Sequence, residues 1–281
     1  MFEKGLLTGK RILITGGGSG LGAAMGRRFA ELGAELIICG RRLEVLQATA
    51  AAIRDKFASQ IDVIQCDIRE GASVEAMMQA IWRKAPLDIL VNNAAATFIA
   101  RTEQLSFRAA DAVLAPTLHG AMYCTLAAGK RWIEAGHKGV ALSILSTSTI
   151  TGRAFTVPSA MAKSAVLAMT KSLAVEWGPK GIRMVAIAPG AFPTEGATGQ
   201  LRPDGRDPNW ASRNPLGRPG EHRELADLAS FLISDAGSYI NGEMVVQDGG
   251  AHLKSSGAED LLAWTDAQWE AQAKARSKRR T

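Results

Sequence analysis

The sequence contains few cysteines and few histidines. Three cysteines, Cys39, Cys66 and Cys124, lie far apart among 281 residues, and only four histidines are present. No Cys-x-x-Cys pair and no histidine cluster occurs, and this absence argues against a zinc site or a disulfide framework. We therefore expect three buried free thiols and no bound metal.

A long hydrophobic run is also missing, and the first residues show no positively charged start followed by an apolar signal core. These absences predict an unexported, cytoplasmic protein without a membrane partner. The formal net charge of +6 is scattered along the chain. The basic residues do not form a stripe with aromatic residues, which is the pattern expected of a nucleic-acid-binding surface. We expect no nucleic-acid partner, whereas anionic small molecules suit this charge.

Hydrophobic residues make up 47% of the 281-residue chain, which is enough to form one large core. Short apolar stretches alternate with helical patterns, which predicts an α/β fold: a doubly wound, Rossmann-type parallel sheet in a single domain over residues 1–250. Residues 251–281 are expected to form a tail with a short amphipathic helix after a capping-box pattern at Thr265 and Gln268. About seven strands are expected, at residues 11–15, 35–39, 62–65, 88–92, 140–146, 183–188 and 243–247.

A glycine-rich loop follows the first predicted strand and precedes a helix with Met25 and Phe29 on one face. Glycines let the backbone approach a pyrophosphate, whose charge is stabilised by free amides at the helix N-terminus. The order strand, glycine loop and helix therefore predicts a dinucleotide site. The contacts expected from this loop are Thr15, Gly16, Gly18, Ser19, Gly20, Leu21 and Gly22.

The end of the second predicted strand indicates which dinucleotide binds. An NAD site places an acidic residue about 20 positions beyond the glycine loop, where it binds the ribose hydroxyls. Here the strand leads into Arg41 and Arg42 instead. Two guanidinium groups suit a 2′-phosphate, so we expect NADP(H) as the cofactor. The alternative is a pair of solvated arginines at a helix start.

Four motifs occur in an order that resembles the short-chain dehydrogenase/reductase family: the glycine loop, Asn92-Asn93-Ala94-Ala95, Lys163 on a helix, and Ala188-Pro189-Gly190. The resemblance extends from about residue 5 to residue 250 and implies a Rossmann-type fold. Within the family, residues 64–69, 92–99 and 169–178 are most similar to the 2,4-dienoyl-CoA reductases.

The resemblance implies positions for the rest of the cofactor and for the substrate. Asp67 and Ile68 are expected at the adenine, Arg69 at the phosphates of coenzyme A, and Lys163 at the cofactor ribose. The family also implies a homotetramer formed through the helix over residues 164–177. Further cofactor contacts are expected from Asn93, Ala94, Ala95, Pro189, Gly190, Phe192 and Thr194.

The family tyrosine is missing, because Ser159 stands four residues before Lys163. A ketone reductase needs an acidic hydroxyl there, and serine cannot easily replace it. The dienoyl-CoA reductases also lack this tyrosine. In them, hydride adds to a conjugated thioester, water is thought to protonate the α-carbon, and donors stabilise charge on the thioester oxygen. The candidate catalytic residues are Lys163, His119, Ser146, Ser148 and Thr117, with Ser159 near the substrate.

Each of these donors has a structural alternative. His119 can be a surface residue, and one of the two serines can cap backbone groups at a strand end. Pro116 should distort the helix near Thr117, and residues 192–219 are a candidate substrate lid.

Three functions therefore remain open. The first is NADPH-dependent reduction of a 2,4-dienoyl-CoA or a related conjugated acyl-CoA. The second is a cofactor-binding protein whose catalysis has lapsed or altered. The third is an ordinary carbonyl or alcohol oxidoreductase, against which the missing tyrosine argues.

Overall fold

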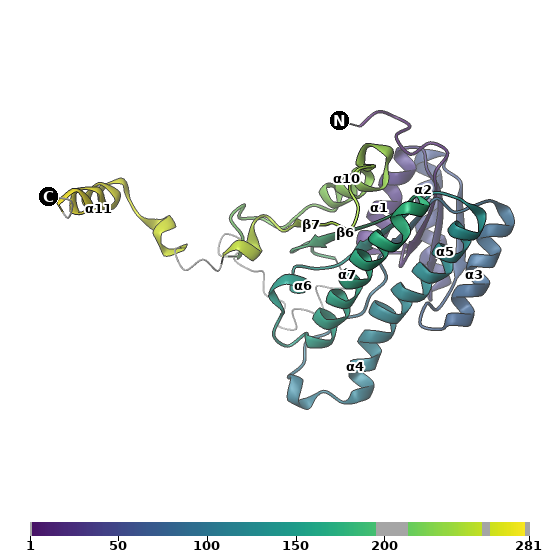
Figure 1. Cartoon of the computed structure of the whole chain (residues 1–281), viewed down its shortest axis with the longest axis horizontal. Helices are drawn as coiled ribbons and strands as arrows, with labels where there is room; N and C mark the ends of the chain where they lie inside the picture. Colours follow the sequence, from purple (N-terminus) through teal and green to yellow (C-terminus); the bar gives the residue numbers. More distant parts are fainter. Residues whose placement is uncertain (1, 195–212, 255–258, 279–281) are drawn as a thin grey trace.

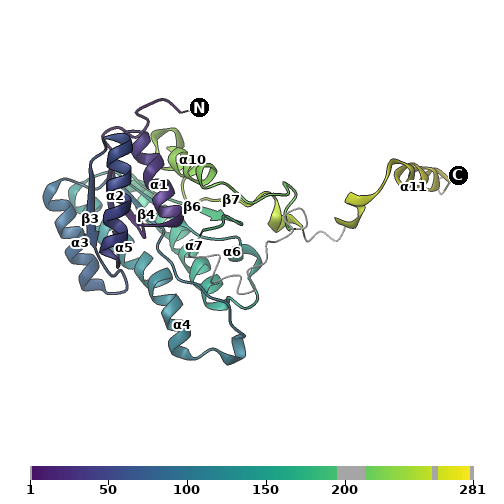
Figure 2. The ribbon, with the colours of Figure 1, turned by 180° about the vertical axis from the view of Figure 1, so that it is seen from behind.

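The structure is a computed structural model that describes residues 2–194, 213–254 and 259–278. Within these residues one parallel sheet has the strand order β3-β2-β1-β4-β5-β6-β7. Figures 1 and 2 show the molecule from opposite sides. The predicted doubly wound sheet in a single domain is confirmed. The strands are β1 (Arg11–Thr15), β2 (Glu35–Gly40), β3 (Ile61–Gln65), β4 (Ile89–Asn92), β5 (Gly139–Ile144), β6 (Ile182–Pro189) and β7 (Met244–Gln247).

Helices cover both faces of the sheet. The hydrophobic cluster on one face includes residues of α1, α2 and α10, and the cluster on the other face includes residues of α3, α5 and α7. Alternation along β1 produces this arrangement, because Ile12 and Ile14 enter the first cluster and Leu13 enters the second. The main helices are α1 (Gly20–Glu31), α2 (Leu43–Phe57), α3 (Gly71–Lys84), α4 (Phe107–Leu114), α5 (Gly120–Ala135), α6 (Ser148–Thr151), α7 (Val157–Trp177), α10 (His222–Ile233) and α11 (Asp266–Lys278).

Two predicted boundaries near the candidate site were wrong. β5 ends at Ile144, so Ser146 follows the strand and Ser148 begins the one-turn helix α6. The helix expected over residues 164–177 begins at Val157. Pro158 does not stop it, because proline is tolerated in the first helical turn, where its missing N–H has no intrahelical partner. Ser159 and Lys163 therefore lie on the same helix.

The distortion predicted at Pro116 is confirmed. Residues Ala115–His119 form a π-helix between α4 and α5. Insertion of a wider turn lets the chain continue past a proline without a regular i to i−4 hydrogen bond. This turn holds Thr117 and His119, so two candidate donors lie on irregular backbone.

The C-terminal part leaves the body of the molecule. Figures 1 and 2 both show the yellow segment with α11 lying apart from the sheet and its helices. Gln268 accepts a hydrogen bond from the backbone N–H of Thr265 at 2.8 Å, as the capping-box pattern suggests. The amphipathic character expected of this helix was wrong, because Trp269 is its only large apolar residue. None of the helices in the described ranges is long and apolar enough to cross a membrane.

Candidate active site

The strand order creates a crevice where the chain changes direction across the sheet. β1 and β4 are neighbours, and the connections from them run toward opposite edges. Such a switch point leaves a gap at the carboxyl ends of the strands, which is where ligands of this fold class bind. The loop after β1 and the loop after β4 meet here. Thr15 joins them, since its Oγ1 accepts hydrogen bonds from the backbone N–H groups of Asn93 at 3.0 Å and Ala94 at 3.1 Å.

The glycine loop is packed too tightly for side chains. A Cβ on Gly22 would lie 2.4 Å from the carbonyl oxygen of Gly16 and 2.6 Å from Nδ2 of Asn93. Gly16 has a positive φ of 66°, which few other residues adopt. Asn93 fixes the turn by donating through Nδ2 to the carbonyl oxygen of Thr15 at 2.9 Å. Its side chain thus shapes the crevice from within the protein.

The N-terminus of α1 is suited to an anion. The helix has no acidic residue in its first turn, and the Ser19 side chain forms no capping hydrogen bond. Amides at this end therefore keep their donors for a ligand such as a pyrophosphate. The Thr194 side chain, from the loop after β6, lies against Gly20 at the start of α1. A Cβ added to Gly20 would be 3.3 Å from Cγ2 of Thr194. The loops after β1 and β6 thus lie together. The glycine-lined cradle fits a dinucleotide.

Basic residues lie beside this crevice at the end of β2. Arg41 and Arg42 are both exposed, and within the described ranges their guanidinium groups form no ion pair. Asp67 instead binds Arg69, whose Nε donates to Oδ1 at 2.9 Å and to Oδ2 at 3.0 Å. This pairing holds the pKa of Asp67 below its usual value, with a smaller contribution from the charge of Arg41. Arg69 is therefore already paired with Asp67, whereas no described residue pairs with Arg41 in this way.

Lys163 and two serines lie at the carboxyl end of β5. Lys163 is buried, and its ammonium donates to the carbonyl oxygen of Ile144. Burial lowers its pKa to about 8, because removing a cation from water disfavours the charged form. Ser146 and Ser148 are hydrogen-bonded through their hydroxyls. Two neutral hydroxyls and the Lys163 ammonium, which reaches over from α7, therefore lie at the carboxyl end of β5.

Thr117 and His119 are placed differently. The Thr117 hydroxyl is buried and spans Ala96, accepting from its N–H at 3.0 Å and donating to its carbonyl oxygen at 3.3 Å. It therefore pins the π-helix to the loop after β4. His119 is exposed, and its ring stacks on Tyr123 with centroids 6.2 Å apart. Among the hydrogen bonds of the described residues, none joins His119 to the serine pair. Its predicted role as a donor stays a prediction.

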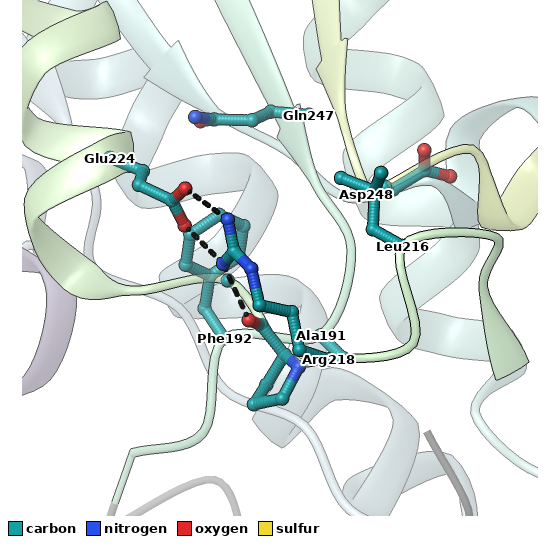
Figure 3. A pocket seen from close by; sticks show the side chains of 10 residues that line it. Ala191, Phe192, Leu216, Arg218, Glu224, Gln247 and Asp248 are labelled. Carbon is teal, nitrogen blue, oxygen red and sulfur yellow. Dashed lines mark hydrogen bonds and ion pairs between the residues drawn. The ribbon is translucent and has the colours of Figure 1, made fainter. Parts of the chain in front are cut away.

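A separate hollow opens beyond the ends of β6 and β7, and Figure 3 shows its lining. Arg218 forms two hydrogen bonds with Glu224, at 2.9 and 2.6 Å, beside Phe192. This pair lowers the pKa of Glu224 to about 2. Sequence reasoning missed Arg218 and Glu224, although the acidic spacing of Glu221 and Glu224 was a helix-start signal. Of the predicted lid, residues 195–212 lie outside the described residues.

These features define a dinucleotide-binding oxidoreductase by their arrangement: a glycine crevice at the switch point and a buried lysine beside it. A family model described as Enoyl-(Acyl carrier protein) reductase matches residues 16–252. The chain belongs to the short-chain dehydrogenase/reductase family, whose members bind a nicotinamide cofactor.

Individual relatives agree with this assignment. The chain is 40% identical over 247 residues to a probable 2,4-dienoyl-CoA reductase of Bacillus subtilis, covering 87% of this chain and 97% of the relative. It is 42% identical over 275 residues to an uncharacterised oxidoreductase of Caenorhabditis elegans, covering 95% and 88%. A crystal structure of a short chain dehydrogenase from Bacillus anthracis has a TM-score of 0.79 and 42% identity, covering 86% of this chain and 96% of that one.

Proposed function

We propose that the protein is an NADPH-dependent reductase of 2,4-dienoyl-CoA thioesters. The observation that carries the proposal is Ser159 on α7, one helical turn before the buried Lys163, where carbonyl-reducing family members have a tyrosine. A site without an acidic hydroxyl is poorly equipped to protonate a ketone oxygen. It remains suited to a conjugated thioester, whose carbon accepts hydride while its oxygen needs only hydrogen-bond donors. The names of several relatives support the same substrate class.

In this reaction, each group of site residues has a separate role. NADPH, when bound, supplies the hydride, and the amides of α1 together with Arg41 hold its phosphates. Lys163 binds the ribose and adds positive potential beside the nicotinamide. Ser146 and Ser148 donate to the thioester oxygen, with His119 as a further candidate donor. Water delivers the proton to the α-carbon. Arg69 serves the phosphates of coenzyme A only if it gives up part of its pairing with Asp67.

A panel of thioesters tests this proposal. Purified protein is mixed with NADPH and with a 2,4-dienoyl-CoA, a 2-enoyl-CoA or a 3-ketoacyl-CoA, and cofactor absorbance is followed. We expect turnover of the dienoyl ester alone. Reduction of the 3-ketoacyl ester would instead establish an ordinary carbonyl reductase. Binding of NADPH without turnover of any ester would favour a cofactor-binding protein with lapsed catalysis.

We also propose a homotetramer, as the family implies. Support comes from apolar side chains on the outer surface of α7, where Met161 is 58% and Val175 is 80% exposed. A helix that packs on the sheet and still exposes such residues is suited to a subunit contact. The cytoplasmic location stays a prediction.

A further inference from the structure

Phe155 has a backbone conformation that bulky residues rarely adopt. Its φ is 65°, in the left-handed region, where the Cβ of any residue other than glycine is crowded. Gly152, shortly before it, has the same φ without that cost. Among the described residues, the other non-glycine residue with a positive φ is Ala58, which caps the C-terminus of α2, a place where this conformation is common. Phe155 precedes a helix instead, so no helix end accounts for its conformation.

The strained backbone joins two segments that border the candidate site. The carbonyl oxygen of Phe155 accepts a hydrogen bond from the backbone N–H of Ala100 at 3.0 Å. Ala100 lies in the loop after β4, which starts with the Asn93 turn of the glycine crevice. On the other side, Phe155 lies between α6, which begins at Ser148, and α7, which carries Lys163. The hydrogen bond therefore connects the cofactor loop to the segment that leads into the lysine helix.

The side chains at this junction are apolar and uncovered. Phe155 is 55% exposed, and Ile99, the neighbour of Ala100, is 39% exposed. Burial of the ring therefore does not offset the strain, because about half of the residue remains in water. Strain that is maintained beside an active site is typical of a residue that contacts a ligand. We call Ile99 and Phe155 together the apolar wall.

We propose that the apolar wall binds the part of the acyl chain beyond its conjugated carbons, so that the enzyme prefers thioesters with longer chains. This inference rests on the proposed function, since it concerns the same substrate. When the thioester oxygen is bound by Ser146 and Ser148, the hydrocarbon tail extends past these donors and needs an apolar surface. The phosphates and amides of coenzyme A are polar and gain nothing from such a surface. Because the Ala100 bond already fixes the backbone of Phe155, less ordering is required when the tail binds.

Calorimetric titration with saturated acyl-CoA thioesters tests the apolar wall without relying on turnover, because these thioesters have no double bond to accept hydride. Butanoyl-CoA, decanoyl-CoA and free coenzyme A are titrated into wild type and Phe155→Ala with saturating NADP⁺ present. In the wild type, we expect decanoyl-CoA to bind at least roughly tenfold more tightly than butanoyl-CoA, because each buried methylene adds affinity. Phe155→Ala should lose most of this gain and bind butanoyl-CoA and coenzyme A as the wild type does.

Two further variants isolate the contribution of the ring. Ile150→Ala is the matched control, because Ile150 is also an uncovered apolar residue at 52% exposure. It follows Ser148 on α6 and points about 200° away from it around the helix, so this variant should keep the gain with chain length. Phe155→Gly removes the ring and also relieves the positive φ. It should lose the gain as Phe155→Ala does, yet unfold at a higher urea concentration than Phe155→Ala.

The outcomes separate this inference from the proposed function. Equal affinity of the wild type for short and long thioesters, or a gain that survives in both Phe155 variants, would overturn the apolar wall. Weaker binding of free coenzyme A by Phe155→Ala would also overturn it and would place the ring against the nucleotide. Turnover of a dienoyl-CoA together with binding that ignores chain length would leave the proposed function standing alone. A gain that depends on Phe155, in a protein that reduces no dienoyl ester, would support the wall and contradict the proposed reaction.

Discussion

At the scale of single residues, Arg41 determines the choice between the two nicotinamide cofactors in our proposal. Its guanidinium is exposed at the end of β2 and unpaired among the described residues, so it is available to a 2′-phosphate. We expect Arg41→Ala to weaken NADPH binding by roughly 10- to 100-fold, because a hydrogen bond to a charged group contributes about 1.5–3 kcal/mol. NADH binding, measured by the same titration, should barely change. Equal losses for both cofactors would contradict the assignment.

The serine pair is the best-placed source of donors for a thioester oxygen. Replacing Ser146 and Ser148 together by alanine should lower kcat on a dienoyl-CoA by at least roughly 100-fold, the usual effect of losing one such donor. NADPH affinity should be unchanged, because the cofactor binds elsewhere. Thr151→Ala is the control, since that hydroxyl is exposed and bonds to the backbone of Thr147 and Gly152. A double mutant with normal kcat would leave His119 as the remaining candidate.

Lys163 should make stability depend on pH. Burial lowers its pKa from 10.5 to about 8 in the folded protein. Between these values the unfolded chain holds the proton and the folded chain does not, so the free energy of unfolding should rise with pH across this window, by up to ~3 kcal/mol. The buried thiols act in the opposite direction, because burial raises the pKa of Cys39, Cys66 and Cys124.

The comparison of wild type with Lys163→Met separates the two effects. Urea unfolding without cofactor, repeated from pH 7 to pH 10.5, should show a smaller gain or a larger loss of stability with pH in the variant. Parallel pH profiles for the two proteins would mean that the ammonium is better solvated than its burial indicates.

At the scale of elements, α1 and the glycine loop are in such close contact that one added methyl group should disrupt their packing. Gly22→Ala would place a carbon 2.4 Å from the Gly16 carbonyl oxygen, so the loop must shift. We expect the variant to lose measurable binding of NADPH and about 1–3 kcal/mol of stability. Gly71→Ala is the matched control, because nothing lies within 4 Å of a Cβ there. Calorimetric titration and urea unfolding measure both quantities.

The sequence predicted the order of elements well and their ends less well. Apolar periodicity located every strand of the sheet, because strands buried on both faces carry an almost continuous apolar signal. The start of α7 could not be found this way, since Val157 and Pro158 lie in a polar and glycine-containing region where only tertiary packing selects the helix. Similarly, Thr117 was a plausible donor by position. Its hydroxyl is instead committed to Ala96, a partner that the π-helix brings close.

At the scale of the whole molecule, the burial of Arg28 could not be predicted from the sequence. It lies beside the predicted apolar face of α1, yet it is only 8% exposed. The reason is a partner far along the chain: Nε donates to Oδ1 of Asp227 on α10 at 2.6 Å. A salt bridge to Glu31 at 3.1 Å and the ring of Phe2 complete its surroundings. Such contacts between distant segments depend on the completed fold and leave no local pattern.

This contact between α1 and α10 should contribute more to stability than its exposed neighbour. Arg28→Ala leaves Asp227 without its closest cation and removes a packed side chain, so we expect a loss of roughly 1–3 kcal/mol in the free energy of unfolding. Arg223→Ala removes an arginine that pairs with the same Glu31 and Asp227. Since that side chain is 52% exposed, its loss should stay within about 1 kcal/mol. Urea unfolding of both variants measures the difference, and equal losses would mean that burial of Arg28 adds nothing to the pairing.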